Sequence, residues 1–266
     1  MRAKKILSHI ICCFLLISVC TSCAKDFSDR IEKAEKKLLK KPYIIEVEID
    51  FDCLDDTVSG IFAEIENSET KIYVKDGRVR AVNEQLIHEG ENEYLFTKKY
   101  TVIGDTVYAD IDYTVNGEDN GKLGKNKAKI DGAKTTALVK ELCIIGGISA
   151  DDFANTMDGK SDGEHFAIYT GISERGREVL ENVMKTQLEG TCDSASLLDA
   201  TLTVKIDERK YDSATLLAEF GVEISGKTYP VSMCVELDFD YGESFDIYLP
   251  DDVDQYVENE LDNFIG

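Results

Sequence analysis

Apolar side chains fall on every second residue between Val231 and Tyr241, with charged or small residues between them. Alternation with a period of two places the two kinds of side chain on opposite faces of a β-strand. The pattern recurs along most of the chain, at Ile45–Cys53, Ile61–Ile65, Lys71–Lys75, Arg78–Val82, Tyr94–Ile103, Thr106–Val115, Phe166–Thr170, Leu202–Ile206, Leu216–Ile224 and Phe245–Leu249. We therefore expect a sheet with one apolar face and one acidic face.

Turn dipeptides separate several of these segments. Asp76-Gly77 and Gly104-Asp105 each lie between two alternating segments, and Ser225-Gly226 precedes the segment that starts at Val231. Glycine tolerates positive φ, so such dipeptides favour tight hairpins. Short connections predict an antiparallel meander. Asn116–Gly124 has three glycines and one apolar residue, and we expect a loop there.

Helical periodicity appears in three regions. Ala24–Lys41 carries an apolar stripe and ends before Pro42, and an insertion at residues 133–189 interrupts the strands. A C-terminal helix is predicted at residues 251–264, with Asp251 as its N-cap. Within the insertion we expect three helices, at Lys134–Ile145, from Ser149 to Met157, and after the N-cap Ser173.

The predicted fold is α+β and mainly β: a large curled antiparallel sheet, or half-barrel, of about 11 strands, with N- and C-terminal helices and the helical insertion. A sheet of this width twists and curls, which turns its apolar face inward. We divide the chain into a signal peptide (1–22), a lipidated N terminus with an amphipathic helix (23–42) and the half-barrel domain (43–266).

The N-terminal residues are typical of an export signal. Three basic residues precede an apolar run that is too short for a comfortable membrane span. The run ends at Val19-Cys20-Thr21-Ser22-Cys23, which resembles the lipobox of bacterial lipoproteins, although Cys20 stands where leucine is usual. This resemblance implies a diacylglyceryl group on Cys23 and a protein anchored to the extracytoplasmic face of the cell membrane. An ordinary signal peptide and an uncleaved anchor are the alternatives.

The net charge narrows the classes of partner. The chain of 266 residues has a formal charge of −22, which disfavours binding to a nucleic acid.

After lipidation of Cys23 four cysteines remain in the mature chain, and exported proteins can form disulfides. Three pairings are possible, of which Cys143–Cys192 is our preferred one because both lie near helix ends; four free thiols are the alternative.

Catalytic and metal-binding patterns are weak. His88 and His165 have no partner at ligand spacing, and Ser68-x-x-Lys71 leads into a strand rather than a helix. Two acidic loops, at Asp158–Gly163 and Asn116–Gly121, lack the glutamate that closes an EF-hand. We expect neither an enzyme nor a bound cofactor or metal.

The order of helix, meander, helical insertion and closing strands, with Ile247-Tyr248-Leu249-Pro250 near the end, resembles the LolA-like superfamily of lipid-binding envelope proteins. The resemblance implies a half-barrel whose concave apolar face binds acyl chains.

On this basis we expect a monomeric, membrane-anchored carrier or binder of an apolar ligand. The alternative is a non-catalytic envelope module that interacts through its acidic outer face. The candidate ligand-binding residues are the apolar positions Ile45, Val47, Ile49, Phe51, Val204, Ile206, Phe220, Val222, Val231, Met233, Val235, Leu237 and Phe239. Alternatively, these residues form an ordinary hydrophobic core that helices cover and that binds no ligand.

Overall fold

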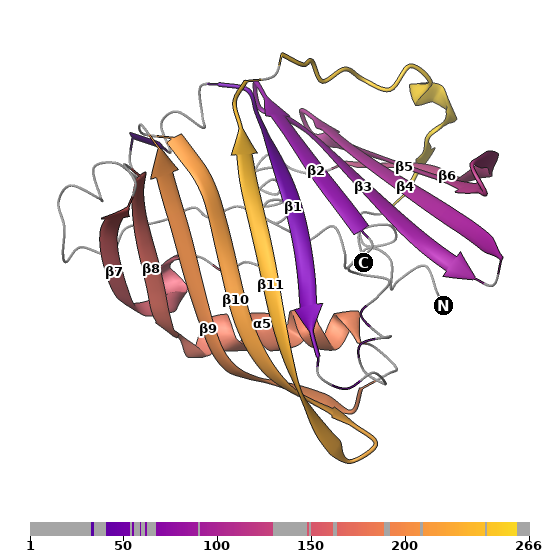
Figure 1. Ribbon diagram of the computed structural model, residues 1–266. Helices are drawn as coiled ribbons and strands as arrows, with labels where there is room; N and C mark the ends of the chain where they lie inside the picture. Colours follow the sequence, from indigo (N-terminus) through magenta and orange to yellow (C-terminus); the bar gives the residue numbers. More distant parts are fainter. Residues whose placement is uncertain are drawn as a thin grey trace.

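A single curled sheet of twelve strands dominates the molecule (Figure 1). The computed structural model describes residues 33–34, 41–53, 55, 59, 62, 68–89, 91–129, 148, 150–161, 164–188, 192–207, 210–242 and 244–259. The strands are β1 (Tyr43–Asp52), β2 (Ser68–Lys75), β3 (Arg78–Glu89), β4 (Asn92–Ile103), β5 (Thr106–Val115), β6 (Glu118–Lys129), β7 (Phe153–Ser161), β8 (Glu164–Ile172), β9 (Ser194–Asp207), β10 (Lys210–Ile224), β11 (Lys227–Asp240) and β12 (Val257–Glu258).

Two meanders make up this sheet. β1 to β6 follow one another in space, as do β7 to β11, and the two meanders join where β1 pairs with β11. At this seam Val47 lies opposite Leu237 and Ile49 opposite Val235, so the alternating patterns of both strands are in phase. Every pairing is antiparallel except the short one between β12 and β6, which is parallel.

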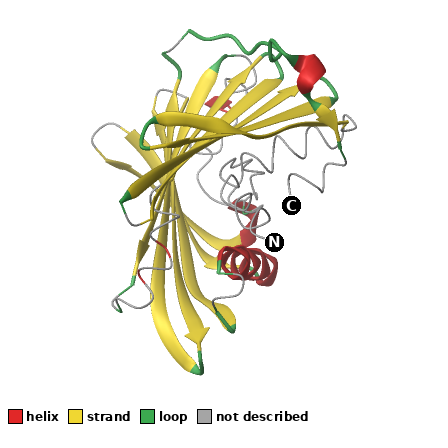
Figure 2. Ribbon diagram, turned by 90° about the vertical axis from the view of Figure 1, so that its right-hand side faces the viewer, coloured by secondary structure: helices red, strands yellow, loops and turns green. Residues whose placement is uncertain are grey.

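The curl gives the sheet an inner, concave face and an outer, convex face. Helix α5 (Glu174–Gln187) lies within the concave side, as Figure 2 shows, and its nearest strand is β9. Leu180, Met184 and Leu188 of this region are buried against the inner face. Apolar side chains are therefore removed from water between a sheet layer and a helix, which supplies most of the driving force for folding.

Hydrogen bonds fix α5 to the sheet at an irregularity in β9. Ser173 Oγ accepts from Gly176 N at 3.1 Å, which confirms the predicted N-cap. Arg177 donates to the carbonyl oxygen of Leu197, and the amide of Leu197 donates to Glu181 Oε1 at 2.9 Å. The register between β9 and β10 shifts beside Leu197, so the helix satisfies backbone groups that the bulge leaves out of the ladder.

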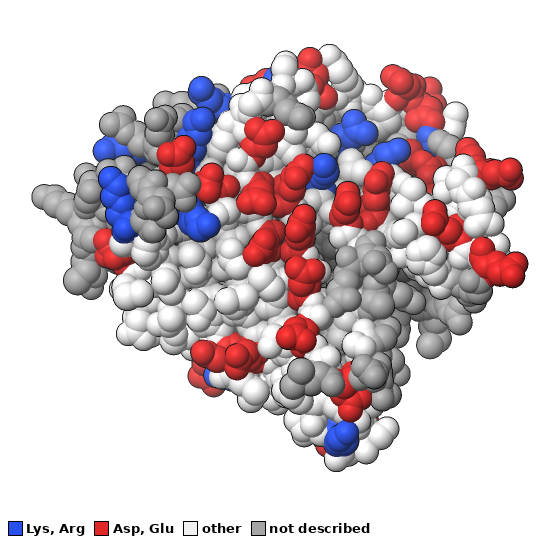
Figure 3. Space-filling view, in the orientation of Figure 1, with Lys and Arg blue, Asp and Glu red and all other residues white. Residues whose placement is uncertain are grey.

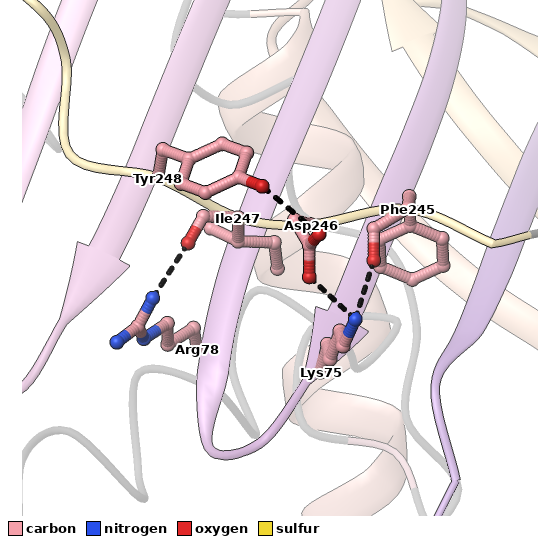
Figure 4. A network of polar contacts seen from close by, with 6 residues as sticks. All are labelled: Lys75, Arg78, Phe245, Asp246, Ile247 and Tyr248. Carbon is pink, nitrogen blue, oxygen red and sulfur yellow. Dashed lines mark hydrogen bonds and ion pairs between the residues drawn. The ribbon is translucent and has the colours of Figure 1, made fainter.

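On the outer face, residues 244–259 form an extended segment that we call the C-terminal strap. Lys75 and Arg78, which flank the β2–β3 turn, donate to the carbonyl oxygens of Phe245 and Ile247, each at 2.8 Å (Figure 4). Lys75 also pairs with Asp246 at 2.5 Å. Ile247 is buried, so the strap packs against the sheet instead of lying loosely over it.

The end of the strap is held at the β6 edge of the sheet. Lys125 of β6 pairs with Asp252 and lies 3.7 Å from Asp110 of β5. Tyr256 is buried, and its ring packs edge-on against that of Tyr108. The strap thus ends as β12 and covers part of β6, which would otherwise present unpaired backbone groups.

The mainly β class and the curled antiparallel sheet are confirmed, but several element predictions are wrong. The segment Asn116–Gly124 is no loop, because β6 begins at Glu118. Asn116 (φ 52°) and Gly117 (φ 79°) form the turn before it. Asn-Gly is a strong hairpin signal, and the backbone pairing with β5 compensates for the low apolar content of β6.

The prediction of helices at Ser149–Met157 and at 251–264 is also wrong within the described residues. A 3₁₀ turn, η2 (Ala150–Asp152), leads into strand β7, and the strap contains only a 3₁₀ turn, η3 (Val253–Gln255). The insertion at 133–189 therefore contributes β7 and β8 to the sheet as well as the confirmed helix α5. Contacts with distant strands outweighed the local helical pattern in each case.

Other predicted elements are partly covered by the described residues. Phe62 is helical, so the strand predicted at Ile61–Ile65 is wrong there, and Phe245–Leu249 lies in the strap rather than in a strand. Lys33 and Ala34 are helical within the predicted Ala24–Lys41 helix. Lys41 is a bend, so the helix does not extend to it. Residues 24–32 and 35–40, the Lys134–Ile145 helix and Cys23 lie outside the described residues.

Candidate functional site

The structure places all the predicted ligand-binding residues on the inner face. They come from four adjacent strands, β1, β11, β10 and β9, and in-phase registers bring them together across the seam. Most of them are buried, whereas Ile49, Phe51 and Phe239 are partly exposed. The buried members are Ile45, Val47, Val204, Ile206, Phe220, Val222, Val231, Met233, Val235 and Leu237.

A different chemistry occupies the inner face of β2, β3 and β4. Thr70 lies opposite Asn83, and Asn83 lies opposite Lys98, so the three side chains form a row across these strands. Each is almost fully buried, with exposed fractions of 5%, 0% and 1%. We call these three residues the polar row. Gln85, two positions after Asn83, is buried on the same face.

The sequence analysis missed the polar row because it ended the strand at Val82. The alternation that starts at Val79 and Ala81 continues to Asn83 and Gln85, so these two residues face the same side of the sheet. Lys98 was assigned to a strand without being assigned to a face. Extending the period of two past Val82 would have found Asn83 and Gln85.

Hydrogen bonds orient the central residue of the row. Asn83 Nδ2 donates to Thr70 Oγ1 at 3.0 Å and to the carbonyl oxygen of Glu69 at 3.5 Å. Asn83 Oδ1 is buried and accepts no hydrogen bond within the described part of the chain. The hydroxyl of Tyr100, two residues after Lys98 on the same face, is likewise buried without a hydrogen-bond partner in these residues.

Burial changes the proton affinity of the side chains in this region. Desolvation lowers the pKa of the Lys98 ammonium to about 8, because the apolar surroundings disfavour the charged form. The same effect raises the pKa of the Tyr100 phenol. The inner face therefore presents a lysine that is easily deprotonated and a phenol that keeps its proton, beside an amide oxygen that can accept a hydrogen bond.

The outer face of the seam is acidic (Figure 3). Glu46 lies opposite Asp238, and Glu48 opposite Glu236, so carboxylates face carboxylates across the strands. Lys71 pairs with Glu46 at 2.7 Å. Like charges in direct cross-strand positions destabilise a sheet. The predicted contrast between an apolar and an acidic face therefore holds at the seam.

The cysteines do not form the predicted disulfide. Cys192 has a free thiol, so the Cys143–Cys192 pairing is wrong; Cys143 itself lies outside the described residues. Cys53 and Cys234 are also free. Cys53 follows the end of β1 and packs against the apolar core, and Cys234 lies opposite Asp50 across the seam.

Two further properties were tested over the described ranges. No group of three histidine, cysteine, aspartate or glutamate side chains in them is arranged to hold a metal ion. None of their helices has the length and hydrophobicity of a bilayer span.

Comparison with known proteins gives only remote similarity. No protein-family model and no curated sequence matches the chain. Among solved structures, a β-barrel-like protein of a domain of unknown function from Brucella abortus has a TM-score of 0.28 at 8% identity, covering 76% of this chain and 98% of its own. The dehydratase domain from the CurF module of curacin polyketide synthase has a TM-score of 0.18 at 11% identity, covering 82% of both chains. These scores are too low to assign the chain a family or a function.

Proposed function

We propose that this protein is an exported lipoprotein, anchored through Cys23, whose half-barrel binds an apolar chain ligand on its inner face. One observation carries the binding proposal: apolar side chains of the inner face remain partly exposed at the seam, at Ile49, Phe51 and Phe239. Partly exposed apolar surface on a concave sheet is where an acyl chain gains most from leaving water. The lipobox-like segment that ends at Cys23 supports the anchoring part of the proposal.

Ligand uptake tests the binding proposal. Soluble protein starting at Ala24 is mixed with the neutral fluorescent probe N-phenyl-1-naphthylamine and then with hexadecanoic acid as competitor. We expect probe fluorescence to rise on binding and to fall on competition. The substitution Ile49→Ser should weaken binding of the probe at least threefold, since it removes apolar surface at the seam.

The matched control is Asp50→Ser, because the neighbouring side chain faces the outer side of the same strand and is exposed. Asp50→Ser should bind as the wild type does. Protein that neither takes up the probe nor carries a lipid in native mass spectrometry would refute the binding proposal.

Anchoring is tested separately by metabolic labelling with an alkyne analogue of palmitate. The full chain should incorporate the label and remain with the membrane fraction, while Cys23→Ala should lose both properties. The control Cys20→Ala, which alters the other cysteine of the lipobox, should keep the label. Equal labelling of the two variants would exclude Cys23 as the acylated residue.

The carboxylates that face one another at the seam favour a second function, an interaction module for a cationic partner. Glu46, Glu48, Glu236 and Asp238 are all exposed, and their cross-strand pairing is unfavourable for folding by roughly 0.2–1 kcal/mol per pair. Binding of a poly-lysine peptide should weaken when these four are changed to amides. Binding that depends equally on acids elsewhere on the surface would argue against this function.

A further inference from the structure

Within the described strands β2, β3 and β4, the polar row and the neighbouring Gln85 interrupt the apolar inner face. Along the same transverse line the sheet presents Leu237, Val47, Thr70, Asn83 and Lys98 in turn, from β11 to β4. All five side chains are buried. The line therefore begins with apolar residues at the seam and ends with an amide and an ammonium group.

Two groups beside this line lack the hydrogen bonds that burial normally requires. Asn83 Nδ2 donates to Thr70 Oγ1 and to the carbonyl oxygen of Glu69, and this carbonyl, which only accepts, favours the amide orientation that leaves Oδ1 without a donor. Tyr100 OH, on the neighbouring strand, is another buried group that makes no hydrogen bond within the described residues. Buried polar atoms rarely remain unsatisfied in a folded protein, because each lost hydrogen bond opposes folding. Two of them on one face indicate a site that a ligand completes.

The types of these groups define the chemistry of the ligand. Asn83 Oδ1 requires a hydrogen-bond donor, such as a hydroxyl or an N–H group. Tyr100 OH can donate to an oxygen atom, and Lys98 on the same strand supplies positive charge for an acidic oxygen. The chain as a whole is strongly negative and repels anions at long range, so an acidic ligand would depend on this buried cation.

We propose that the polar row with Tyr100 is the head-group subsite for an acidic amphiphile, whose apolar chain extends past Val47 to the partly exposed Ile49 and Phe51 at the seam. The head carries an acidic oxygen, as a carboxylate or a phosphate, together with a hydroxyl or N–H donor. This inference rests on the proposed function, since it assigns the polar end of the same ligand. In a site shielded from water, ion pairs and hydrogen bonds to the head are stronger than at the surface.

Competition against N-phenyl-1-naphthylamine tests the subsite with four ligands that separate head from chain. Hexadecyl phosphate, hexadecanoic acid, neutral hexadecanol and inorganic phosphate are each titrated into the soluble protein. We expect both acidic amphiphiles to compete at least tenfold better than hexadecanol. Inorganic phosphate should not displace the probe, because it lacks the chain. Displacement by phosphate alone would mean that the head site works without the apolar face, and would overturn the inference.

Variants then assign the effect to Lys98. The substitution Lys98→Met should reduce the preference for acidic over neutral ligand at least fivefold and leave hexadecanol unchanged. The matched control is Lys99→Met, the next residue of β4, whose side chain lies toward the other face. Asn83→Leu is a second variant of similar volume. It should lower the affinity for a monoacylglycerol phosphate, whose glycerol hydroxyl can donate to Asn83 Oδ1, more than the affinity for hexadecyl phosphate, which has no glycerol hydroxyl.

The outcomes separate the two proposals. If no chain ligand competes, the proposed function fails and the head-group subsite fails with it. If all three chain ligands compete equally and Lys98→Met changes nothing, the binding function stands and the subsite is overturned. Loss of hexadecanol binding in Lys98→Met, with a melting temperature no lower than that of the wild type, would place Lys98 in the chain site instead and would also overturn the subsite.

Discussion

The two parts of the sheet bury very different side chains with the same alternation. In β9, β10 and β11, the inner face consists of residues such as Leu202, Phe220 and Val235, packed in one core with the residues of α5. In β2, β3 and β4, it includes Asn83 and Lys98. The first region gains stability from every buried position, whereas the second gives up stability at several. A protein that retains such positions is expected to use them.

The two parts of the sheet also differ in what covers their outer face. Around the seam and β10 the outer face is open to solvent, with exposed acids and exposed Leu217. Over β2 to β6, the strap crosses the outer face and is held by Lys75, Arg78 and Lys125. The region with the weaker inner core is therefore the one that receives outer reinforcement.

The largest expected effect is the loss of packing near α5. Phe220→Ala should lower the free energy of unfolding by about 3–5 kcal/mol, because a buried ring is removed and a cavity remains. Chemical denaturation of the wild type and the variant measures this loss in unfolding free energy. Leu217→Ala, on the exposed side of the same strand, should change stability by less than about 0.5 kcal/mol. Equal losses for the two variants would remove the contrast between the faces.

In the polar region, replacing Lys98 should raise the free energy of unfolding at pH 7 instead of lowering it. Burial lowers the pKa of Lys98 to about 8, against 10.5 for an unfolded lysine. Between these values the unfolded chain binds more protons than the folded one, so stability rises as the pH increases from 8 toward 10. The rise attributable to this lysine should be about 2 kcal/mol by pH 10.

The measurement is a series of denaturation curves between pH 7 and pH 10 for wild type and Lys98→Met. Lys98→Met should be more stable than the wild type at pH 7, since methionine carries no charge to bury. Its stability should therefore lack the increase of about 2 kcal/mol between pH 8 and pH 10 that Lys98 gives the wild type. Lys99→Met should keep the wild-type slope. A slope that survives in Lys98→Met would show that another group is responsible.

The strap should contribute less to stability than the core near α5 and no more than the polar region. Lys125 has a side-chain exposure of 7% and lies between Asp110 and Asp252, so Lys125→Met leaves two carboxylates without their common cation. We expect a loss of about 2 kcal/mol, since the carboxylates are partly solvated, together with faster proteolysis within residues 244–259.

The control for the strap is Lys129→Met on the same strand. Lys129 pairs with Asp105 at 2.7 Å, but both side chains are 64% exposed, and a pair this exposed to water and salt contributes little to stability. Limited proteolysis of this variant should match that of the wild type. If both variants release the strap, its anchoring does not depend on the buried pair.

Local patterns predicted much of the sheet correctly. The alternation at Val231–Tyr241 corresponds to β11, and Asp76-Gly77, Gly104-Asp105 and Ser225-Gly226 all lie at hairpin turns. These signals succeed because the pleat and the φ preferences of turn residues are local properties. They failed for β7, for β6 and for the strap, where the neighbouring strand or the outer face determines the conformation.

The candidate site was predictable only in its apolar half. Residues such as Val47 and Leu237 were identified from their alternation, and their common face is confirmed. Asn83 was missed because, in sequence, a polar residue after an apolar segment looks like the end of the strand. Lys98 was missed because its predicted strand was not assigned an inner face. Their burial depends on strands far away in the chain, which no local pattern reports.

By itself, the sequence determined which face of each clear strand is apolar, where most hairpins turn, and that the outer side of the seam is acidic. Only the tertiary structure decided that β1 pairs with β11, that the strap crosses the outer face, and that Asn83, Lys98 and Tyr100 are buried together. The physical reason is range: alternation and turn preference act over a few residues, whereas strand pairing and burial depend on segments that meet only in the folded chain.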